Sequence, residues 1–240
     1  MKPPKIAMVL AAGLGKRMRP VTDTIPKPLV PVAGKPLIDW GLDSLAEAGV
    51  ERAVVNVHYL ADQVEAHLAG RKTPAITISD ERDLLLESAG GIVKALPALG
   101  QEPFYIINSD TFWIERGKPN LAMLADCWNP ERMDILLMLT APERATGYTG
   151  RGDFTMDAAG RLARLAGRDV PALIYAGAAI INPAIFEGSV IEPGSLNIYF
   201  DRAIACGRLS GMVLDGHWLT VGTPEAISEA EATISAVVAA

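Results

Sequence analysis

The sequence predicts an α/β fold in which helices flank a mostly parallel sheet, with a smaller antiparallel β excursion in the second half. Short apolar runs alternate with helical patterns over the first 140 residues, and strand-like segments joined by turns dominate after that point. Half of the 240 residues are hydrophobic, which excludes a wholly disordered chain and allows a sizeable core. No stretch approaches the ~18 uninterrupted apolar residues of a membrane span.

In the first half, short apolar runs bounded by turn-forming residues predict buried strands. These runs cover residues 5–10, 52–57, 75–79, 104–108 and 134–140. Between them, apolar positions recur at helical spacing, as Leu37, Trp40 and Leu45 do before Gly49 ends that pattern. The predicted helices cover residues 36–48, 61–68, about 91–96 and 120–127. Strands that alternate with helices in this way favour a parallel sheet covered on both faces.

In the second half, residues 153–157 and 161–165 predict two strands joined by a turn at residues 157–160. Further strands are expected at residues 173–181, 209–214 and 218–221, with a helical turn at 183–186 and a helix at 197–207. Pro224 begins a last helix, which has Ile227, Ala230, Ile234 and Val238 on one face. Since no linker, repeat or charge block divides the chain, residues 1–240 are expected to form a single domain.

The charge distribution argues against a nucleic-acid partner. The chain carries 22 basic and 28 acidic side chains, but residues 1–35 contain seven basic side chains and only one acid, Asp23. The remaining residues therefore carry a net charge of −12, which repels a phosphate backbone. A small polyanion held at one basic segment fits this pattern better.

The N-terminal segment has too short an apolar run for a signal peptide. Cys127 and Cys206 stand far apart and match neither a disulfide framework nor a zinc site. His58, His67 and His217 share no metal-ligand spacing. We therefore expect a cytoplasmic protein with no membrane partner.

The segment from Leu10 to Pro28, LAAGLGKRMRPVTDTIPKP, contains the candidate chemistry. A predicted strand ends at Leu10 and is followed by small residues, which let backbone N–H groups approach a phosphate closely. Basic residues follow within four positions of Gly15, and Pro26 and Pro28 bracket Lys27, which predicts an extended conformation for that lysine. The alternative interpretation is a basic surface loop.

Two common phosphate-binding motifs are excluded. The dinucleotide fingerprint fails because Met18 stands where its third glycine is needed. A Walker A loop fails because Leu10 occupies the position of its first glycine. The segment is therefore neither a nicotinamide site nor a P-loop.

Asp110 is the candidate metal ligand. It follows the predicted strand 104–108, at the carboxyl end where open α/β sheets bind ligands. A carboxylate beside a triphosphate is repulsive unless a hard cation lies between them, so Asp110 implies Mg²⁺. The alternative is an aspartate that caps a turn after a strand.

The loop closely resembles the signature of sugar-1-phosphate nucleotidyltransferases, L-A-A-G-x-G-x-R-M-x-P-x-T followed by P-K-P. The resemblance extends to residues 108–110, 175–177 and 218–224, and thus to nearly the whole chain. It implies a Rossmann-like, GT-A-like fold with a nucleotide-binding part at about 1–140, a sugar-phosphate-binding part at about 141–223 and a C-terminal helix at about 224–239. Within the family the chain is most similar to short bacterial enzymes that uridylate N-acetylmuramic acid 1-phosphate in cell-wall recycling.

The resemblance implies roles for individual residues. Arg17 would stabilise the departing β- and γ-phosphates, Lys27 would lie between the phosphates of the two substrates, and Asp110 would hold Mg²⁺. The nucleotide would be bound by Ala11, Ala12, Gly13, Gly15, Lys27, Glu87 and Asn108. The sugar phosphate would be bound by Gly152, Arg168 and Gly177. Turn-forming glycines and a solvated arginine are the alternatives at those last three positions.

One position departs from the family pattern. Many relatives have Trp-x-Asp where this chain has Trp218-Leu219-Thr220, and that aspartate is the second metal ligand. A hydroxyl is a weaker ligand than a carboxylate, so Thr220 implies a weakened metal site, a site rescued by Asp215, or a protein that has lost catalysis.

Three functions are therefore considered. The first is a Mg²⁺-dependent nucleotidyltransferase that uses UTP and N-acetylmuramic acid 1-phosphate, or else GTP with mannose 1-phosphate or dTTP with glucose 1-phosphate. The second is a non-catalytic nucleotide-sugar sensor, against which the intact Arg17 and Lys27 argue. The third is a nucleic-acid binder, which the charge distribution disfavours. A monomer and a dimer are both compatible with the sequence.

Overall fold

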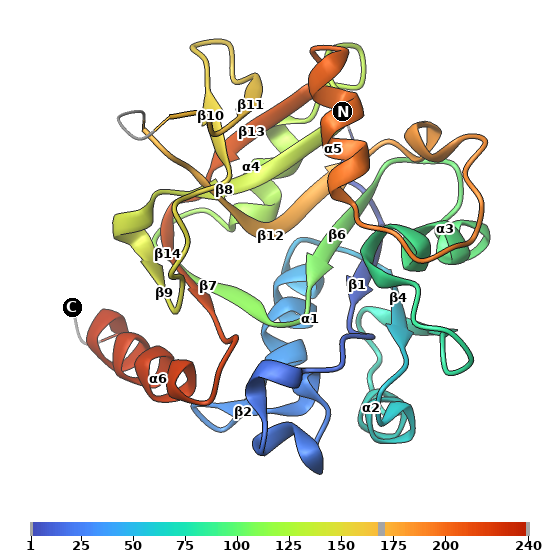
Figure 1. Cartoon of the computed structure of the whole chain (residues 1–240), viewed down its shortest axis with the longest axis vertical. Coiled ribbons are helices and arrows are strands. Elements are labelled where there is room, and N and C mark those ends of the chain that lie inside the picture. The colour runs from blue at the N-terminus through green and yellow to red at the C-terminus, as the bar shows by residue number, and fades with distance from the viewer. Residues whose placement is uncertain (1, 168–170, 239–240) are drawn as a thin grey trace.

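The computed structural model describes residues 2–167 and 171–238. Its main element is a seven-stranded sheet with the strand order β13-β8-β12-β6-β1-β4-β5 (Figure 1). These strands are β1 (Ile6–Leu10), β4 (Arg52–Val57), β5 (Ala75–Asp80), β6 (Phe104–Asn108), β8 (Ile135–Thr140), β12 (Ile174–Ile181) and β13 (Leu209–Val213). β12 runs antiparallel to both of its neighbours, and every other neighbouring pair is parallel. The predicted α/β fold with a mostly parallel sheet is confirmed.

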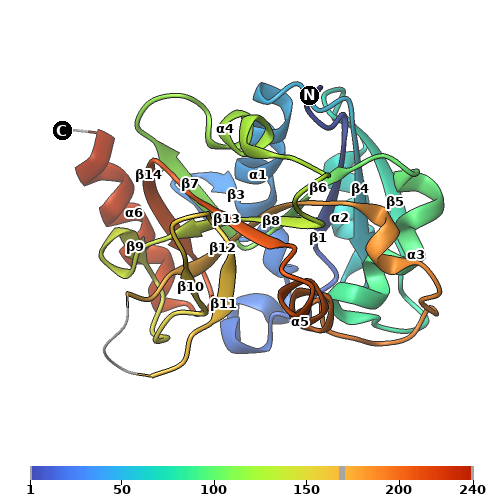
Figure 2. The ribbon, with the colours of Figure 1, turned by 90° about the horizontal axis from the view of Figure 1, so that it is seen from above.

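Helices cover both faces of this sheet, as the alternation of strands and helices predicts. Apolar side chains of α1 (Leu37–Glu47), α2 (Ala61–Leu68) and α4 (Asn120–Cys127) join one buried cluster with alternate strand residues. Those of α3 (Glu87–Leu99) and α5 (Asn197–Ala205) join a second cluster on the opposite face. In Figure 2, α4 and α5 lie on opposite sides of β8, β12 and β13.

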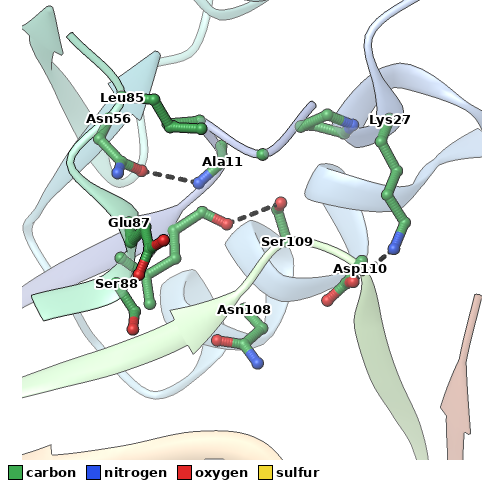
Figure 3. Close-up of a pocket in the computed structure, with 13 residues that line it drawn as sticks. Ala11, Lys27, Asn56, Leu85, Glu87, Ser88, Asn108, Ser109 and Asp110 are labelled. Atoms are coloured by element: carbon green, nitrogen blue, oxygen red, sulfur yellow. Dashed lines mark hydrogen bonds and ion pairs between the residues drawn. The ribbon is translucent and has the colours of Figure 1, made fainter. Parts of the chain in front are cut away.

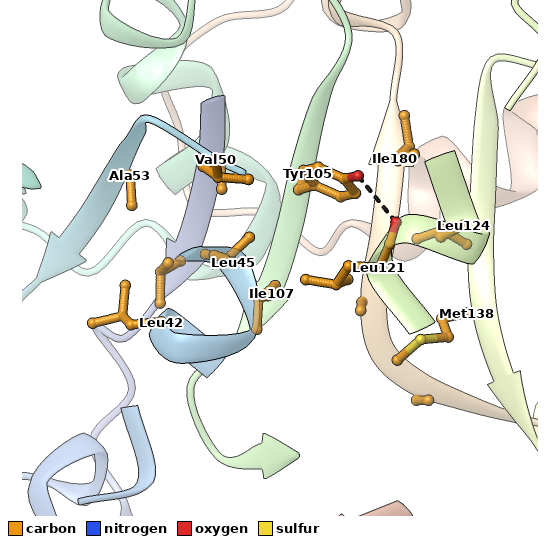
Figure 4. Packing of buried hydrophobic residues seen from close by; sticks show 14 of the residues in the cluster. Leu42, Leu45, Val50, Ala53, Tyr105, Ile107, Leu121, Leu124, Met138 and Ile180 are labelled. Carbon is orange, nitrogen blue, oxygen red and sulfur yellow. Dashed lines mark hydrogen bonds between the residues drawn. The ribbon is translucent and has the colours of Figure 1, made fainter. Parts of the chain in front are cut away.

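The strand pattern shows why this sheet is buried on both sides. Ala7 and Val9 of β1 belong to the first cluster, whereas Met8 between them belongs to the second. Within the first cluster, the Tyr105 hydroxyl donates a hydrogen bond of 3.0 Å to the backbone oxygen of Leu121, which fixes α4 to the sheet (Figure 4). Six of the seven strands thus contribute apolar side chains to both clusters, which explains why they are rich in apolar residues, whereas the edge strand β5 contributes Ile76 and Ile78 to the first cluster alone.

Short strands complete the fold in three small sheets. They form the sheets β7-β14-β9, β10-β11 and β2-β3, with β2 (Pro31–Val32), β3 (Lys35–Pro36), β7 (Thr111–Glu115), β9 (Ala145–Thr146), β10 (Phe154–Met156), β11 (Leu162–Arg164) and β14 (Gly216–Thr220). The C-terminal helix α6 (Glu225–Val238) packs against the first of these sheets, where its residues Ala226 and Ala230 share a third apolar cluster with Leu219 and Val221. That cluster also contains Met18 of the signature loop, so α6 and the loop share one apolar core.

The structure corrects the extent of one predicted helix and adds detail that the sequence did not predict. The helix expected at 91–96 spans Glu87–Leu99, because its N-terminal end is held by a buried side chain, and Pro97 near its end removes only one helical hydrogen bond. The strand β7 was not predicted. The antiparallel excursion is only partly separate: β12 enters the main sheet between β6 and β8, and the hairpin β10-β11 lies outside it.

Candidate active site

A cavity of about 330 Å³ opens where β1 and β6 end at their carboxyl termini (Figure 3). We call it the main cavity. It is lined by Leu10, Ala11, Ala12, Gly13, Lys27, Pro28, Asn56, Leu85, Glu87, Ser88, Asn108, Ser109 and Asp110. Segments far apart in the sequence meet here, as expected for the carboxyl edge of a parallel sheet. Seven of the residues expected to act on the nucleotide or the metal line this cavity: Ala11, Ala12, Gly13, Lys27, Glu87, Asn108 and Asp110.

The small residues of the signature loop form one wall. The Ala11 backbone N–H donates a hydrogen bond of 2.7 Å to the Asn56 side-chain oxygen, which fixes the chain as it leaves β1. A Cβ atom at Gly13 would meet no heavy atom within 4 Å, so the backbone there faces open space. A phosphate or nucleoside can therefore approach the main chain of Gly13 closely.

Gly15 shapes the loop and does not line the main cavity. Its φ of +61° is left-handed, and a Cβ atom there would lie 3.0 Å from Cγ2 of Thr22. The Thr22 hydroxyl donates a hydrogen bond of 2.8 Å to the Gly15 backbone oxygen, which closes the turn. Glycine is therefore needed at this position because of the backbone conformation and the close approach of Thr22.

Lys27 and Asp110 meet at the edge of the main cavity. The Lys27 ammonium lies 2.5 Å from Oδ2 of Asp110, and the two side chains are 11% and 31% exposed. The expected extended conformation of Lys27 is wrong, because Lys27 begins a short 3₁₀ turn, Lys27–Leu29. Pro28 fits that turn because its missing N–H falls in the first turn, where no bond is needed. The contact brings together two residues that the sequence assigned separately to the phosphates and to the metal.

Arg17 lies in the turn Lys16–Met18, outside the lining of the main cavity. Its exposed guanidinium passes over Gly222, where a Cβ atom would stand 3.4 Å from Nη1. Within residues 2–167 and 171–238, Arg17 forms neither a hydrogen bond nor an ion pair with another side chain. It thus retains all of its donors for a ligand.

Backbone pairing places Thr220 next to Asp110. Thr220 is opposite Thr111 in the β14–β7 ladder, and the Val221 N–H donates a hydrogen bond of 3.0 Å to the Asp110 backbone oxygen. Asp215 precedes the other end of β14, where it lies 3.8 Å from a guanidinium nitrogen of Arg144. Since five extended residues span roughly 16 Å, Asp215 cannot replace Thr220 as a ligand beside Asp110. Of the three alternatives that Thr220 left open, the one in which Asp215 rescues the metal site is therefore wrong.

The donor set fits a metal held by one protein carboxylate. Among the described residues, no three His, Cys, Asp or Glu side chains gather as a metal cage. Mg²⁺ is commonly bound by one or two carboxylates together with substrate phosphates and water. Asp110, at the cavity edge and partly exposed, matches this kind of ligand.

The first residues of α3, together with Leu85 just before it, form the opposite wall of the main cavity. Glu87 adopts a left-handed φ of +58°, an uncommon conformation for a side chain of this size. In Figure 3, Glu87 and Ser88 face the signature loop across the cavity. Such local strain requires support from the surrounding structure.

A second, smaller cavity of about 270 Å³ adjoins the first, since Leu10, Ser88 and Asn108 line both. We call it the adjoining cavity. Its other lining residues are Asp153, Phe154, Arg164, Tyr175, Leu196, Asn197 and Phe200. Arg164 is held in place by a 2.7 Å bond to Asp201 and a 2.9 Å bond to the Asn197 side chain. The adjoining cavity thus presents a guanidinium that is held by its ion pair with Asp201, and the carboxylate of Asp153 lines the same cavity.

Two of the three sequence-predicted sugar-phosphate residues, Gly152 and Gly177, lie on this side of the molecule. Gly177 has a φ of +77° at a bulge in β12, where a Cβ atom would collide with the Thr111 hydroxyl. Gly152 has a φ of +99° and lines a further hollow that shares Arg164 with the adjoining cavity. Arg168 lies outside the described residues. Steric requirements therefore explain both glycines.

Sequence reasoning missed several residues of the main cavity: Asn56, Leu85, Ser88 and Ser109. Asn56 carried a signal, because a polar side chain stands inside the apolar run RAVVNV at the end of a buried strand. The Ser109 hydroxyl donates a bond of 2.8 Å to the Leu10 backbone oxygen and so joins β1 to β6.

In the part of the chain that the structure describes, no helix is long and apolar enough to cross a membrane.

The fold and the main cavity define an α/β protein with a phosphate-compatible loop at the edge of its sheet. A family model described as nucleotidyl transferase matches residues 6–166. Two proteins named N-acetylmuramate alpha-1-phosphate uridylyltransferase are similar over nearly the full length. The one from Caulobacter vibrioides is 46% identical, with 97% of this chain and 98% of that protein aligned. The one from Neisseria meningitidis serogroup B is 38% identical, with 96% and 98% aligned.

Solved structures show the same fold. A UDP-glucose pyrophosphorylase complexed with UDP-glucose superposes with a TM-score of 0.74 at 21% identity, covering 98% of this chain and 99% of that one. The chain belongs to the nucleotidyl transferase family, which confirms the resemblance inferred from the signature loop. Members of this family generally depend on a divalent metal.

Proposed function

We propose that this protein transfers the uridylyl group of UTP to N-acetylmuramic acid 1-phosphate, giving UDP-N-acetylmuramic acid and pyrophosphate. The observation that carries the proposal is the meeting of Lys27 and Asp110 beside the glycine-containing loop. The choice of substrates is supported by the two similar proteins, whose names specify this reaction.

In this reaction a phosphate oxygen of the sugar 1-phosphate attacks the α-phosphorus of UTP. The bond between the α-phosphorus and the bridging oxygen breaks, and pyrophosphate leaves. Because two polyanions must approach each other, catalysis depends on positioning and on charge neutralisation. The Lys27 ammonium would stand between the two sets of phosphates, and the Arg17 guanidinium would bind the departing β- and γ-phosphates. Backbone groups of Ala11–Gly13 and the side chain of Asn108 would hold the nucleotide.

We propose Mg²⁺ as the metal, held by Asp110 and the substrate phosphates. When bound, the ion would supply positive charge to the triphosphate. Thr220 lies next to Asp110 and would contact the ion through water, since neutral hydroxyls are weaker ligands than carboxylates. A reduced protein contribution of this kind predicts a higher Mg²⁺ requirement than a site with two carboxylates would have.

The adjoining cavity would hold the sugar. N-acetylmuramic acid differs from N-acetylglucosamine by a lactyl group with a carboxylate, and the Arg164 guanidinium, which is oriented by its ion pair with Asp201, lies on the cavity wall. Arginine binds carboxylates well because its planar donors match their geometry. Gly152, Gly177 and Arg168 would complete this side of the site.

A panel assay of pyrophosphate release tests the proposal. UTP, GTP and dTTP are each paired with the 1-phosphates of N-acetylmuramic acid, N-acetylglucosamine, mannose and glucose, with and without Mg²⁺. The proposal expects the highest kcat/KM with UTP and N-acetylmuramic acid 1-phosphate. If kcat/KM is higher with GTP and mannose 1-phosphate, or with dTTP and glucose 1-phosphate, then that pair is the substrate pair and the proposed one is wrong. Nucleotide-sugar binding without any turnover would instead establish a sensor.

We further propose that the reaction takes place in the cytoplasm, where nucleoside triphosphates are available. Size-exclusion chromatography with light scattering would decide between the monomer and the dimer that the sequence allows.

A further inference from the structure

A buried carboxylate lies beneath the main cavity and touches both of its walls. Glu81 is fully buried, and Asn56 beside it is 2% exposed. The Asn56 side-chain nitrogen donates a hydrogen bond of 2.8 Å to Oε1 of Glu81. Within residues 2–167 and 171–238, Glu81 forms no ion pair. Burying an acidic group without a cationic partner is costly, so such a group requires an explanation.

The hydrogen bonds of this pair end on the two walls of the cavity. On one side, the Asn56 oxygen accepts a bond of 2.7 Å from the Ala11 N–H in the signature loop. On the other side, Oε2 of Glu81 accepts a bond of 3.0 Å from the Leu86 N–H, next to Glu87 with its left-handed φ. The chain of hydrogen bonds Ala11–Asn56–Glu81–Leu86 therefore links the two walls of the cavity. Figure 3 shows its first bond, between Ala11 and Asn56.

The helix behind the pair leaves no room for it to move. A Cβ atom at Gly91 of α3 would stand 2.6 Å from Oε1 of Glu81 and 2.7 Å from Nδ2 of Asn56. Glycine is otherwise unfavourable inside a helix, so its presence here fits a close approach of these side chains. Three elements thus confine the Asn56–Glu81 pair from different directions.

From this geometry we infer that Glu81, acting through Asn56 and Leu86, is a positioning residue that sets the separation of the two cavity walls and thereby the affinity for the nucleoside triphosphate. The inference rests on the proposed function, because it takes the main cavity as the nucleotide site. Glu81 has no contact with the sugar side, since it lines neither the main nor the adjoining cavity. The effect of its loss should therefore fall on the nucleotide and not on the sugar 1-phosphate.

The test exploits the polarity of the pair. In Glu81→Gln, no orientation of the two amides satisfies both backbone N–H groups and the link between the side chains. In Asn56→Asp, two carboxylates face each other. In the double variant Glu81→Gln/Asn56→Asp, the new amide donates to the new carboxylate, so the link between the side chains is restored with its direction reversed. The Ala11 and Leu86 N–H groups again donate to a side-chain oxygen, as in the wild type. Size and the number of acidic groups are preserved in the double variant.

Steady-state kinetics should separate the nucleotide effect from a general loss of folding. Each single variant is expected to raise the KM for UTP about tenfold, as expected for one lost buried hydrogen bond, with the KM for the sugar 1-phosphate within about twofold. The double variant should return the KM for UTP to within about threefold of the wild type. Should a single variant not fold, Gly91→Ala provides a second perturbation, because it displaces Glu81 without changing a polar group and should raise the same KM.

Glu115→Gln is the matched control. Glu115 accepts hydrogen bonds from Trp113 Nε1 at 2.6 Å and from the Asn120 N–H at 3.1 Å, outside both cavities. It should lower the melting temperature and leave the KM for UTP unchanged. An unchanged KM for UTP in both single variants, or a double variant as impaired as the worse single one, would overturn the inference. A wild-type protein that does not bind UTP would overturn the proposed function instead.

Discussion

Replacing Lys27 by methionine removes one positive charge from the candidate active site and keeps the length of the side chain. The Lys27 side chain is 11% exposed, and its ammonium lies 2.5 Å from the Asp110 carboxylate. The variant therefore changes the electrostatics where two polyanions would converge, with little change in packing.

The size of the effect follows from the position of the charge. Two unit charges 4 Å apart interact by about 4 kcal/mol at the effective dielectric constant of a protein surface site. Removing one preorganised donor to a developing oxyanion typically costs about 3–4 kcal/mol of transition-state stabilisation. Since each 1.36 kcal/mol is a factor of ten in rate, kcat should fall by about two to three orders of magnitude. The free energy of unfolding should change by only about 1 kcal/mol, because the Asp110 carboxylate keeps access to water.

Pyrophosphate release with saturating UTP and sugar 1-phosphate measures kcat, and thermal unfolding verifies the fold. Lys118→Met is the control, because Lys118 forms an exposed ion pair with Asp126 away from both cavities. The control should keep its turnover. A Lys27→Met protein with kcat within threefold of the wild type would refute the assignment of Lys27 to the phosphates.

Three further predictions follow from neighbouring groups. Arg17→Ala should lower kcat and weaken UTP binding while leaving the affinity for the nucleotide-sugar product nearly unchanged, because the phosphates it binds leave as pyrophosphate; equal losses in calorimetric titrations would contradict this role. Asp110→Asn should nearly abolish turnover, whereas Thr220→Asp should lower the Mg²⁺ concentration for half-maximal rate, and wild-type Mg²⁺ curves in both would refute the metal site. Burial, aided by the charge of Arg144, lowers the pKa of His217, so the folded state binds its proton less readily than the unfolded state. The fold favours the neutral imidazole, so the stability that this preference contributes is fully present above pH 6.5 and is lost as the pH falls through the lowered pKa. The melting temperature should therefore drop more steeply between pH 7 and 5 in the wild type than in His217→Gln.

The sequence predicts the main sheet well because its strands are short apolar runs between turn-forming residues. β4 and β6 begin and end at the predicted residues, and β1 and β8 differ by one residue at the start. The missed strand β7 follows the main-sheet strand β6 after two residues, and its partner β14 lies about 100 residues further along the chain. Such a pairing leaves no local signal, and the same is true of the insertion of β12 between β6 and β8.

In the candidate site too, features set by neighbouring residues could be predicted from the sequence, whereas contacts between distant segments could not. The glycine-containing loop and the proline-bracketed lysine are local patterns, and the structure places Ala11–Gly13 and Lys27 on one cavity. The contact of Lys27 with Asp110, 83 residues apart, and the link from Asn56 to Glu81 depend on which strands become neighbours. A polar residue inside an apolar strand indicates that a buried partner exists, but the identity of that partner is a tertiary property.

The Lys27–Asp110 pair also has a consequence for metal binding. In the free protein, each group neutralises the other, so a cation that binds Asp110 must compete with the ammonium 2.5 Å away. Removing that competitor should help the cation: Lys27→Met should bind Mg²⁺ more tightly than the wild type, although the same change destroys turnover. Because water partly screens the interaction of about 4 kcal/mol between such charges, a gain of about tenfold in Mg²⁺ affinity is expected. Isothermal titration of Mg²⁺ into the nucleotide-free proteins measures it, and Lys27→Met/Asp110→Asn should abolish the gain. Equal affinities in the wild type and Lys27→Met would mean that Asp110 does not bind the metal in the free protein.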